Sequence, residues 1–227
     1  MSAGFKTGHA TREALDILFE GTAALGVELP PDGAAKLILL LDALDDWNQR
    51  MNLTAIKRRE QQLTKHLLDS LSVQPYLRGE RVADIGTGAG FPGLPLALVN
   101  PDKLFTLVDS TAKKLAFVQH AAGIMGLTNV QTVHTRAEAF RPKKRFHGVL
   151  SRAVGPIERF VQSSGHLCAG GGRLLAMKGR FPEEELQHLP NGWKLAGAHR
   201  LTVPKLEEER HLVEICRSHD KVTDDDE

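Results

Sequence analysis

The chain has 227 residues, enough for one sizeable hydrophobic core with a small extension. Its composition, 41% hydrophobic and 25% charged, is ordinary for a globular protein and does not indicate disorder, and at a net charge of +1 any nucleic-acid binding must come from local basic patches. The two cysteines, Cys168 and Cys216, lack metal-ligand spacing, which argues against a zinc site or a disulfide framework and indicates a reducing compartment.

Residues 1–80 are predicted to form a helical extension. Apolar residues recur at helical spacing from Leu15 to Leu25 and again from Leu37 to Trp47. The segment "MNLTAIKRRE" interrupts the helices, and "QQLTKHLLDSLSVQPYL" predicts a third helix that ends near Pro75. The extension has no signal-peptide pattern and no apolar run long enough to span a bilayer, so we expect a cytoplasmic protein that does not bind membranes.

Residues 81–218 alternate between strand and helix patterns. Strands are predicted at 81–86, 104–109, 129–134, 146–153, 172–179, 193–203 and 210–218. This alternation predicts a doubly wound, Rossmann-like α/β domain with a seven-stranded, mostly parallel sheet. The last two strands have no helix between them, so the last strand is predicted to be antiparallel. Residues 219–227 are predicted to be a flexible acidic tail.

The stretch "RVADIGTGAGFPGLPLAL" carries the strongest functional signal. Gly86, Gly88 and Gly90 alternate directly after a buried strand, and a helical pattern follows. The segment "GAGFPG" formally matches the dinucleotide fingerprint, which would indicate a nicotinamide-dependent oxidoreductase. However, the carboxylate of Asp84 would repel a pyrophosphate, whereas it would favour the sulfonium and ammonium groups of S-adenosylmethionine. The charge at this position therefore favours S-adenosylmethionine as the cofactor.

Residues after the next three strands complete the predicted cofactor site. Asp109 ends the second strand, where an acid can accept hydrogen bonds from ribose hydroxyls, although a helix N-cap is a compatible alternative. Ala137 and Glu138 follow the third strand and are placed beside the adenine. Arg152 follows the fourth strand, and a structural ion pair is as plausible for it as contact with the cofactor carboxylate or an RNA phosphate.

The methyl acceptor is predicted by what the sequence lacks. The fourth strand ends in "SRAVGP" instead of the Asn/Asp-Pro-Pro-aromatic turn of amino-directed enzymes. Cys168, expected at a helix end, and Cys216, in the last strand, are interpreted as buried apolar residues and not as nucleophiles. Guanine N7 is the acceptor that agrees with these absences, because it has a free lone pair and loses no proton on methylation. No residue is therefore predicted as a catalytic acid, base or nucleophile, and His66 and His134 are interpreted as structural or surface residues.

Local basic runs indicate an RNA partner, although a solvated face is the commoner explanation for each run alone. The predicted RNA-binding residues are Lys57, Arg58, Arg59, Lys178 and Arg180, and "RPKKRF" at 141–146 is a further basic run that could join them on one edge.

Several motifs together are similar to those of one family. "MNLTAI", "HLLDSL", "DIGTGAGFPGLPLAL", "LVDSTAKKLAFV", "RAEAF", "SRAV" and "AMKG" resemble the RsmG (GidB) family of bacterial small-subunit rRNA methyltransferases, from about Leu41 to Cys216. The resemblance implies a class I methyltransferase that transfers a methyl group from S-adenosylmethionine to N7 of a guanine in 16S rRNA (guanine 527 in rRNA numbering).

The resemblance also implies which residues line the site. By matched motif it places the cofactor against Gly86, Phe91, Ala137, Glu138 and Arg152, with Asp109 on the ribose side, and it adds Asn52, in "NLTAI", near the acceptor pocket. Ala89 departs from the proline of many relatives at that position. The implied partner is 16S rRNA or the small ribosomal subunit, with no metal. A non-enzymatic ribosome-assembly factor that retains the fold remains an alternative.

Overall fold

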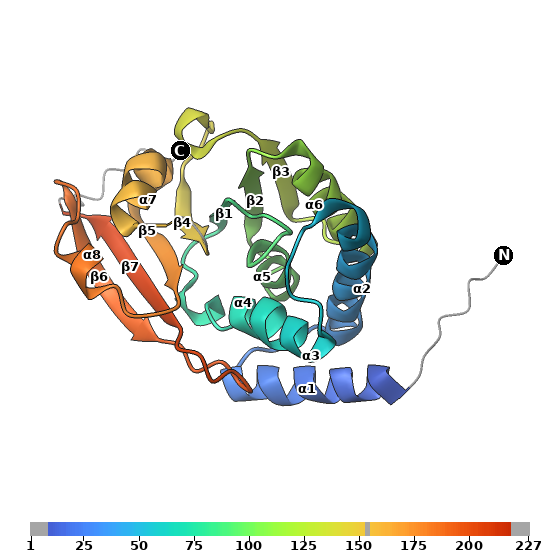
Figure 1. The fold of residues 1–227 in the computed structure, drawn as a ribbon. Coiled ribbons are helices and arrows are strands. Elements are labelled where there is room, and N and C mark those ends of the chain that lie inside the picture. Colours follow the sequence, from blue (N-terminus) through green and yellow to red (C-terminus); the bar gives the residue numbers. More distant parts are fainter. Residues whose placement is uncertain (1–8, 153–154, 219–227) are drawn as a thin grey trace.

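The computed structural model describes residues 9–152 and 155–218, which form one seven-stranded sheet with helices packed around it (Figure 1). The strands are β1 (Arg81–Ile85), β2 (Leu104–Asp109), β3 (Val130–His134), β4 (Phe146–Ser151), β5 (Cys168–Lys178), β6 (Trp193–Arg200) and β7 (His211–Arg217). All seven strands were predicted from the sequence, with ends that shift by a few residues. Cys168 lies in β5, so its predicted place at the end of a helix was wrong.

The sheet has the strand order β3-β2-β1-β4-β5-β7-β6. Neighbouring strands from β3 to β5 are parallel, and β7 runs antiparallel to both β5 and β6. The mostly parallel sheet and its antiparallel last strand are therefore confirmed. The carboxyl ends of β1 to β5 all lie at one edge of the sheet, which is where ligands bind in open α/β folds.

The helices account for most of the remaining described chain. They are α1 (His9–Leu25), α2 (Gly33–Met51), α3 (Arg59–Gln62), α4 (Asp69–Leu71), α5 (Gly93–Val99), α6 (Ala112–Ile124), α7 (Ile157–Ser164) and α8 (Glu183–Leu186), with short 3-10 turns at Gln74–Tyr76, Ala137–Ala139 (η3) and Gly165–Leu167. None of them is both long and apolar enough to cross a membrane within the described ranges.

The N-terminal helices share their core with the sheet. Leu37, Leu40 and Leu44 of α2 are fully buried, in the same apolar cluster as Phe105 of β2 and Phe117 of α6. Figure 1 shows α1 along the bottom of the molecule with α3 and α4 directly above it, and α2 at the right beside α6. This packing places the loop from 52 to 58, which precedes α3, near the edge of the sheet that carries the candidate site.

The third helix contains a π-helical segment that its apolar pattern did not predict. It starts as α3, continues as η1 (Leu63–Leu68) with π geometry and ends as α4. The amide of Asp69 donates to the carbonyl of Thr64, five residues earlier, which is the hydrogen bond that defines a π-helix. Such segments occur mostly as single turns and frequently at functional sites.

Candidate functional site

The glycine-rich turn between β1 and α5 has the conformation that its sequence predicted. Gly86, Gly88 and Gly90 all have positive φ, at 69°, 60° and 84°. Side chains at these positions would be strained, which explains the alternating glycines. The position a Cβ would occupy on Gly88 has only the carbonyl oxygen of Gly86 within 4 Å, at 3.9 Å, so the protein leaves open space above the turn.

The backbone amides of the turn are nearly all bonded within the protein. Those of Gly86 and Thr87 donate to Val108, that of Gly88 to Asp109, those of Gly90 and Phe91 to Thr87, and that of Gly93 to Asp84. Pro92 has no amide hydrogen, so from 86 to 93 only Ala89 has an amide without a partner among the described residues. A pyrophosphate needs several free amides at this point. The turn therefore does not offer the anion cradle of a dinucleotide site.

Asp84 lies fully buried beneath the turn. Its Oδ2 accepts hydrogen bonds from the hydroxyl of Thr87, at 2.7 Å, and from the amide of Gly93, at 3.0 Å. Burial raises the pKa of Asp84 to about 6, against the lowering effect of these two hydrogen bonds. The Oδ1 atom is buried and has no hydrogen-bond partner among the described residues. Asp84 thus holds the turn together and also keeps a carboxylate oxygen that a cationic ligand could satisfy.

Gly93 makes this arrangement possible because it has no side chain. A Cβ at this position would lie 2.8 Å from Oδ2 of Asp84 and 2.9 Å from Cγ of Leu107. Real Cβ atoms essentially never approach so closely, and both neighbours are buried. The fourth glycine of the motif is therefore required by packing.

Asp109 joins the end of β2 to the same turn. Its Oδ2 accepts the amide of Gly88 at 3.0 Å, and its Oδ1 accepts the amide of Thr111 at 2.8 Å. Thr111 is the N-cap of α6, so the alternative that Asp109 caps this helix was wrong; its carboxylate instead accepts the amide of the capping residue. Each carboxylate oxygen still has a lone pair, because a carboxylate has about four acceptor sites.

Ala137 and Glu138 lie in the 3-10 turn η3, beyond the carboxyl end of β3. Ala137 packs against the second apolar cluster of the core, and Glu138 is exposed. Because β3 pairs with β2, both residues are on the same edge of the sheet as Asp109. The structure thus brings together the predicted residues that follow the first three strands.

Arg152 follows β4 and is held by the N-terminal helices. Its Nη1 donates to the carbonyl of Lys65 at 2.9 Å and lies 3.6 Å from Oδ2 of Asp69. Its guanidinium carbon is 5.6 Å from the centre of the Phe91 ring. Asp69 also accepts a hydrogen bond from Nε of Arg210 at 3.1 Å. The sequence did not point to Asp69 or Arg210, because they are distant in the chain from Arg152.

The "NLTAI" segment meets the glycine turn through His66. The Nε2 atom of His66 is 2.9 Å from the hydroxyl of Thr54, and its ring is stacked on that of Phe91, with 4.6 Å between centres. Burial, followed by the positive charge of Arg152, lowers the pKa of His66 to about 3. Asn52, by contrast, is exposed and ends α2 in a left-handed conformation, which is a common role for Asn.

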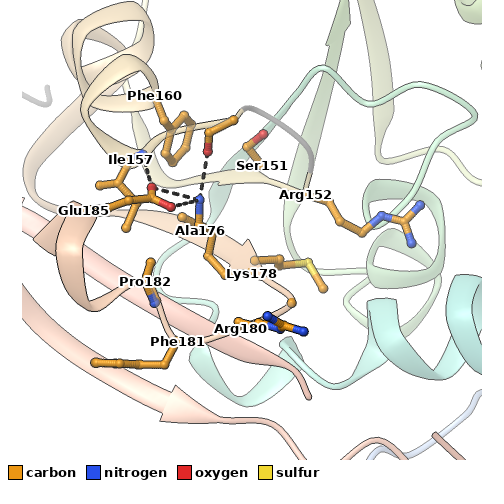
Figure 2. A pocket seen from close by; sticks show the side chains of 13 residues that line it. Ser151, Arg152, Ile157, Phe160, Ala176, Lys178, Arg180, Phe181, Pro182 and Glu185 are labelled. Atoms are coloured by element: carbon orange, nitrogen blue, oxygen red, sulfur yellow. Dashed lines mark hydrogen bonds and ion pairs between the residues drawn. The ribbon is translucent and has the colours of Figure 1, made fainter. Parts of the chain in front are cut away.

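A cavity of about 390 Å³ lies at the carboxyl ends of β4 and β5 (Figure 2). Lys178 lines it but is occupied, because its Nζ donates to the carbonyl of Gly155 and to both carboxylate oxygens of Glu185 at 2.8–2.9 Å. Glu185 also accepts the amide of Ile157, the first residue of α7. Arg180 is exposed at the rim of the cavity. Figure 2 shows the Lys178–Glu185 pair between the strand end and α8.

The three basic residues of "IKRRE" differ in their surroundings. Arg59 is bound to Asp42 at 2.5 Å and to Asp45 at 3.1 Å, which fixes α3 on α2. Lys57 and Arg58 are exposed, and Arg58 has only a long contact to a neighbouring glutamate in its own segment. Lys57 and Arg58 therefore present their charges to solvent, whereas Arg59 serves the fold.

The basic run at 141–146 does not lie wholly on the edge that carries the site. It connects η3 to β4: Arg141 donates to the carbonyl of Glu138, whereas the carbonyl of Arg145, at the amino ends of the parallel strands, accepts a hydrogen bond from Nε of Arg81, the first residue of β1. The expectation that all the basic runs could share one edge was wrong.

No three His, Cys, Asp or Glu side chains gather closely enough to hold a metal ion within 9–152 and 155–218. Both cysteines are buried, in β5 and β7, and neither forms a disulfide.

Comparison of the fold shows similarity to methyltransferases. The structure of TrmN from Thermus thermophilus matches with a TM-score of 0.53 and 19% identity, over 68% of this chain and 53% of that one. A SAM dependent methyltransferase from Aquifex aeolicus also matches with a TM-score of 0.53, at 16% identity, over 68% of this chain and 92% of that one. At these identities the likeness shows the fold alone, a Rossmann-like methyltransferase fold.

Comparison of the sequence is more specific. A protein of Nitrosococcus oceani named "Ribosomal RNA small subunit methyltransferase G" is 44% identical over 88% of this chain and 94% of its own length. A protein of the same name from Azoarcus sp. is 45% identical over 88% of this chain and 95% of its own length. The family model described as "GidB: rRNA small subunit methyltransferase G" matches residues 34–213. The chain belongs to this family of rRNA small subunit methyltransferases.

Proposed function

We propose that the protein binds S-adenosylmethionine at the glycine turn and methylates N7 of a guanine in the 16S rRNA of the small ribosomal subunit. Family membership supports the methyltransferase activity and the class of substrate. The observation that carries the choice of cofactor is the turn itself, in which almost every amide is used internally while the carboxylates of Asp84 and Asp109 are buried beside it. Such a turn suits a cationic nucleoside better than a diphosphate.

The described residues fit this cofactor. We propose that Asp109 accepts hydrogen bonds from the ribose hydroxyls, since it lies at the end of β2 with unused lone pairs. Oδ1 of Asp84 has no hydrogen-bond partner among the described residues, and we propose that a cationic group of the cofactor supplies one. The open space above Gly88 lets a ligand approach the backbone. Ala137 and Glu138 are proposed to lie beside the adenine. When bound, S-adenosylmethionine supplies a methyl group activated by its sulfonium.

The acceptor atom is proposed to be guanine N7, whose methylation needs no general base, because the histidine at the turn is poorly suited to act as one. Within the described part of the chain, His66 is the histidine whose ring stacks on the turn, and its pKa of about 3 makes it too weak a base to remove a proton efficiently near neutral pH. Methylation of N7 releases no proton, so positioning of the two reactants supplies the catalysis.

The proposed RNA surface consists of exposed residues around the site. Lys57, Arg58 and Arg180 are exposed and bear no close ion pair among the described residues, and Asn52 lies near Lys57 and Arg58 in the chain. Lys178 and Arg59 were also predicted to bind RNA, but their charges are engaged by Glu185 and by the two aspartates of α2. We propose that these two residues act by shaping the surface.

Mass mapping of 16S rRNA from cells with and without the protein tests the reaction. Loss of one N7-methylguanine, at guanine 527 by the family resemblance, is the expected result. Unchanged methylation would leave only the role of a non-enzymatic assembly factor. Calorimetry with S-adenosylmethionine and NAD tests the cofactor, and binding of NAD alone would favour the oxidoreductase alternative.

The pH dependence of the chemical step tests the acceptor atom. Single-turnover rates at saturating cofactor and RNA are expected to be flat from about pH 6.5 to 8.5, since no proton is removed. A steep rise with pH that disappears on substitution of one histidine would show that a base is at work and would exclude N7.

A further inference from the structure

Two aromatic rings connect the N-terminal helices with the glycine turn. The rings of His66, in η1, and Phe91, in the turn, are nearly parallel, with an interplanar angle of 12° and 4.6 Å between their centres. Their exposed fractions are only 5% and 3%. The amide of Phe91 donates to the carbonyl of Thr87, so the place of its ring is tied to the course of the turn. Whatever fixes the Phe91 ring therefore also fixes the backbone between Gly88 and Gly93.

His66 is itself fixed from the other side. Its Nε2 is 2.9 Å from the hydroxyl of Thr54, in the loop that follows α2. Asn48 of α2 holds Thr54 through two hydrogen bonds of 2.9 Å. The amide of Thr54 donates to Oδ1 of Asn48, and Nδ2 of Asn48 donates to the carbonyl of Thr54. A continuous set of contacts thus runs from α2 through Thr54 and His66 to Phe91.

The helix is irregular at the residue that makes this contact. His66 lies within the π segment, whose hydrogen bonds span five residues instead of four. A π turn inserts one extra residue and rotates the side chains around it, and such turns are frequently found at functional sites. The irregularity sets the directions of two neighbouring side chains: His66 faces Phe91, and Asp69 faces Arg152.

We infer that His66 is a positioning residue, which holds the Phe91 ring and thereby keeps the glycine turn in the shape that binds the cofactor. This inference rests on the proposed cofactor site. It explains why a histidine is suitable here. The position needs a flat ring to stack on Phe91 and also a polar atom at the ring's far side to meet Thr54, and an imidazole provides both in a buried space.

The test measures cofactor affinity and intrinsic stability separately. His66→Gln keeps a polar group but removes the stacked ring, and we expect it to weaken binding of S-adenosylmethionine about 3- to 10-fold, in line with the loss of an aromatic pair. His66→Phe keeps the stack and loses the contact to Thr54, and we expect affinity within about 3-fold of the wild type. Calorimetry gives the dissociation constants, and urea unfolding without ligand gives the stabilities.

The matched control is His211→Gln. His211 is also buried, with 9% exposure, and also touches a phenylalanine ring, that of Phe181, with 5.7 Å between centres. Its Nδ1 is buried without a partner among the described residues, as is that of His66. We expect this variant to lose stability while its affinity for S-adenosylmethionine stays unchanged, because Phe181 is not in the turn.

A double-mutant cycle with Phe91→Leu keeps the inference testable if one variant is poorly folded. Effects of His66→Gln and Phe91→Leu on cofactor affinity are expected to be strongly non-additive, because each removes the same stack. Wild-type affinity in folded His66→Gln, or equal losses in His66→Gln and His211→Gln, would overturn the positioning role. If the wild-type protein itself does not bind S-adenosylmethionine, the proposed cofactor fails instead, which is a distinct result.

Discussion

Replacement of Asp84 by Asn is expected to stabilise the ligand-free protein while it weakens binding of the cofactor. Asp84 is fully buried, and burial raises its pKa from 3.8 to about 6. The difference between these two pKa values corresponds to roughly 3 kcal/mol. The free energy of unfolding is lower by this amount at pH 8, where the buried carboxylate is ionised. Asn removes the charge, and its carbonyl oxygen can still accept from Thr87 and Gly93.

The sign of the pH dependence follows from the raised pKa of Asp84. Below about pH 4 the carboxyl is protonated in both states and makes no difference to stability. Between about pH 4 and 6 the unfolded chain releases the proton while the native protein keeps it, so stability falls as pH rises. Above that window the loss is constant. The advantage of Asp84→Asn is therefore expected to shrink from about 3 kcal/mol at pH 8 to roughly half of that at pH 5.

Two measurements check this prediction. Urea unfolding of the wild type and of Asp84→Asn at pH 5 and pH 8 gives the difference in stability, with other titrating groups common to both proteins. Calorimetry at pH 8 is expected to show a loss of about 1–3 kcal/mol in the binding of S-adenosylmethionine, since a charge-assisted contact is removed. A variant that is less stable than the wild type at pH 8, yet binds the cofactor equally well, would show that Asp84 serves only the turn.

Further substitutions test other parts of the site. Gly93→Ala is expected to cost about 1–3 kcal/mol of stability and to weaken cofactor binding, because its Cβ would lie 2.8 Å from Asp84 Oδ2. Gly123→Ala in α6 is the matched control, with no atom within 4 Å of the new Cβ, and thermal unfolding should show it neutral or more stable by up to about 1 kcal/mol. Replacing both Lys57 and Arg58 by Ala should lower the salt dependence of RNA binding, measured by filter binding at several salt concentrations, and leave cofactor affinity unchanged. Arg59→Ala should instead reduce stability by up to about 1 kcal/mol, because its ion pairs with Asp42 and Asp45 are partly exposed, and an unchanged unfolding curve would contradict this assignment.

Periodicity and turn chemistry were sufficient to predict the sheet. Each strand pattern is bounded by glycine, proline or polar residues, and these local signals are enough to place the strands to within a few residues. The alternation of strands with helices then fixes which chain segments lie at the carboxyl edge. For that reason the turn at Gly86–Gly90, Asp109, Ala137–Glu138 and Arg152 could all be assigned to one edge before their contacts were known.

Charge patterns were a poorer guide, because a sequence does not show which opposite charges lie nearby. Arg59 and Lys178 stand in basic runs, yet each is bound to carboxylates that come from other elements, 14–17 residues away for Arg59 and seven for Lys178. Arg152 was ambiguous for the same reason, and Asp69, its partner, is 83 residues away in the chain. Whether a charged residue binds a ligand or forms an internal ion pair can therefore be decided only once the fold is known.

The π segment shows a second limit of sequence patterns, and it concerns the site directly. The apolar residues of 61–77 fit an ordinary helix, so nothing in their spacing distinguishes His66 from a surface residue of that helix. One additional residue in a single turn directs this histidine at Phe91, 25 positions later, and buries it so that only 5% of it is exposed. Its neutral charge state is a consequence of that burial and of Arg152, and it removes the imidazole as an effective base near neutral pH. The burial of His66 against Phe91, which its sequence pattern did not predict, thus supports both the shape of the turn and the assignment of an acceptor atom that loses no proton.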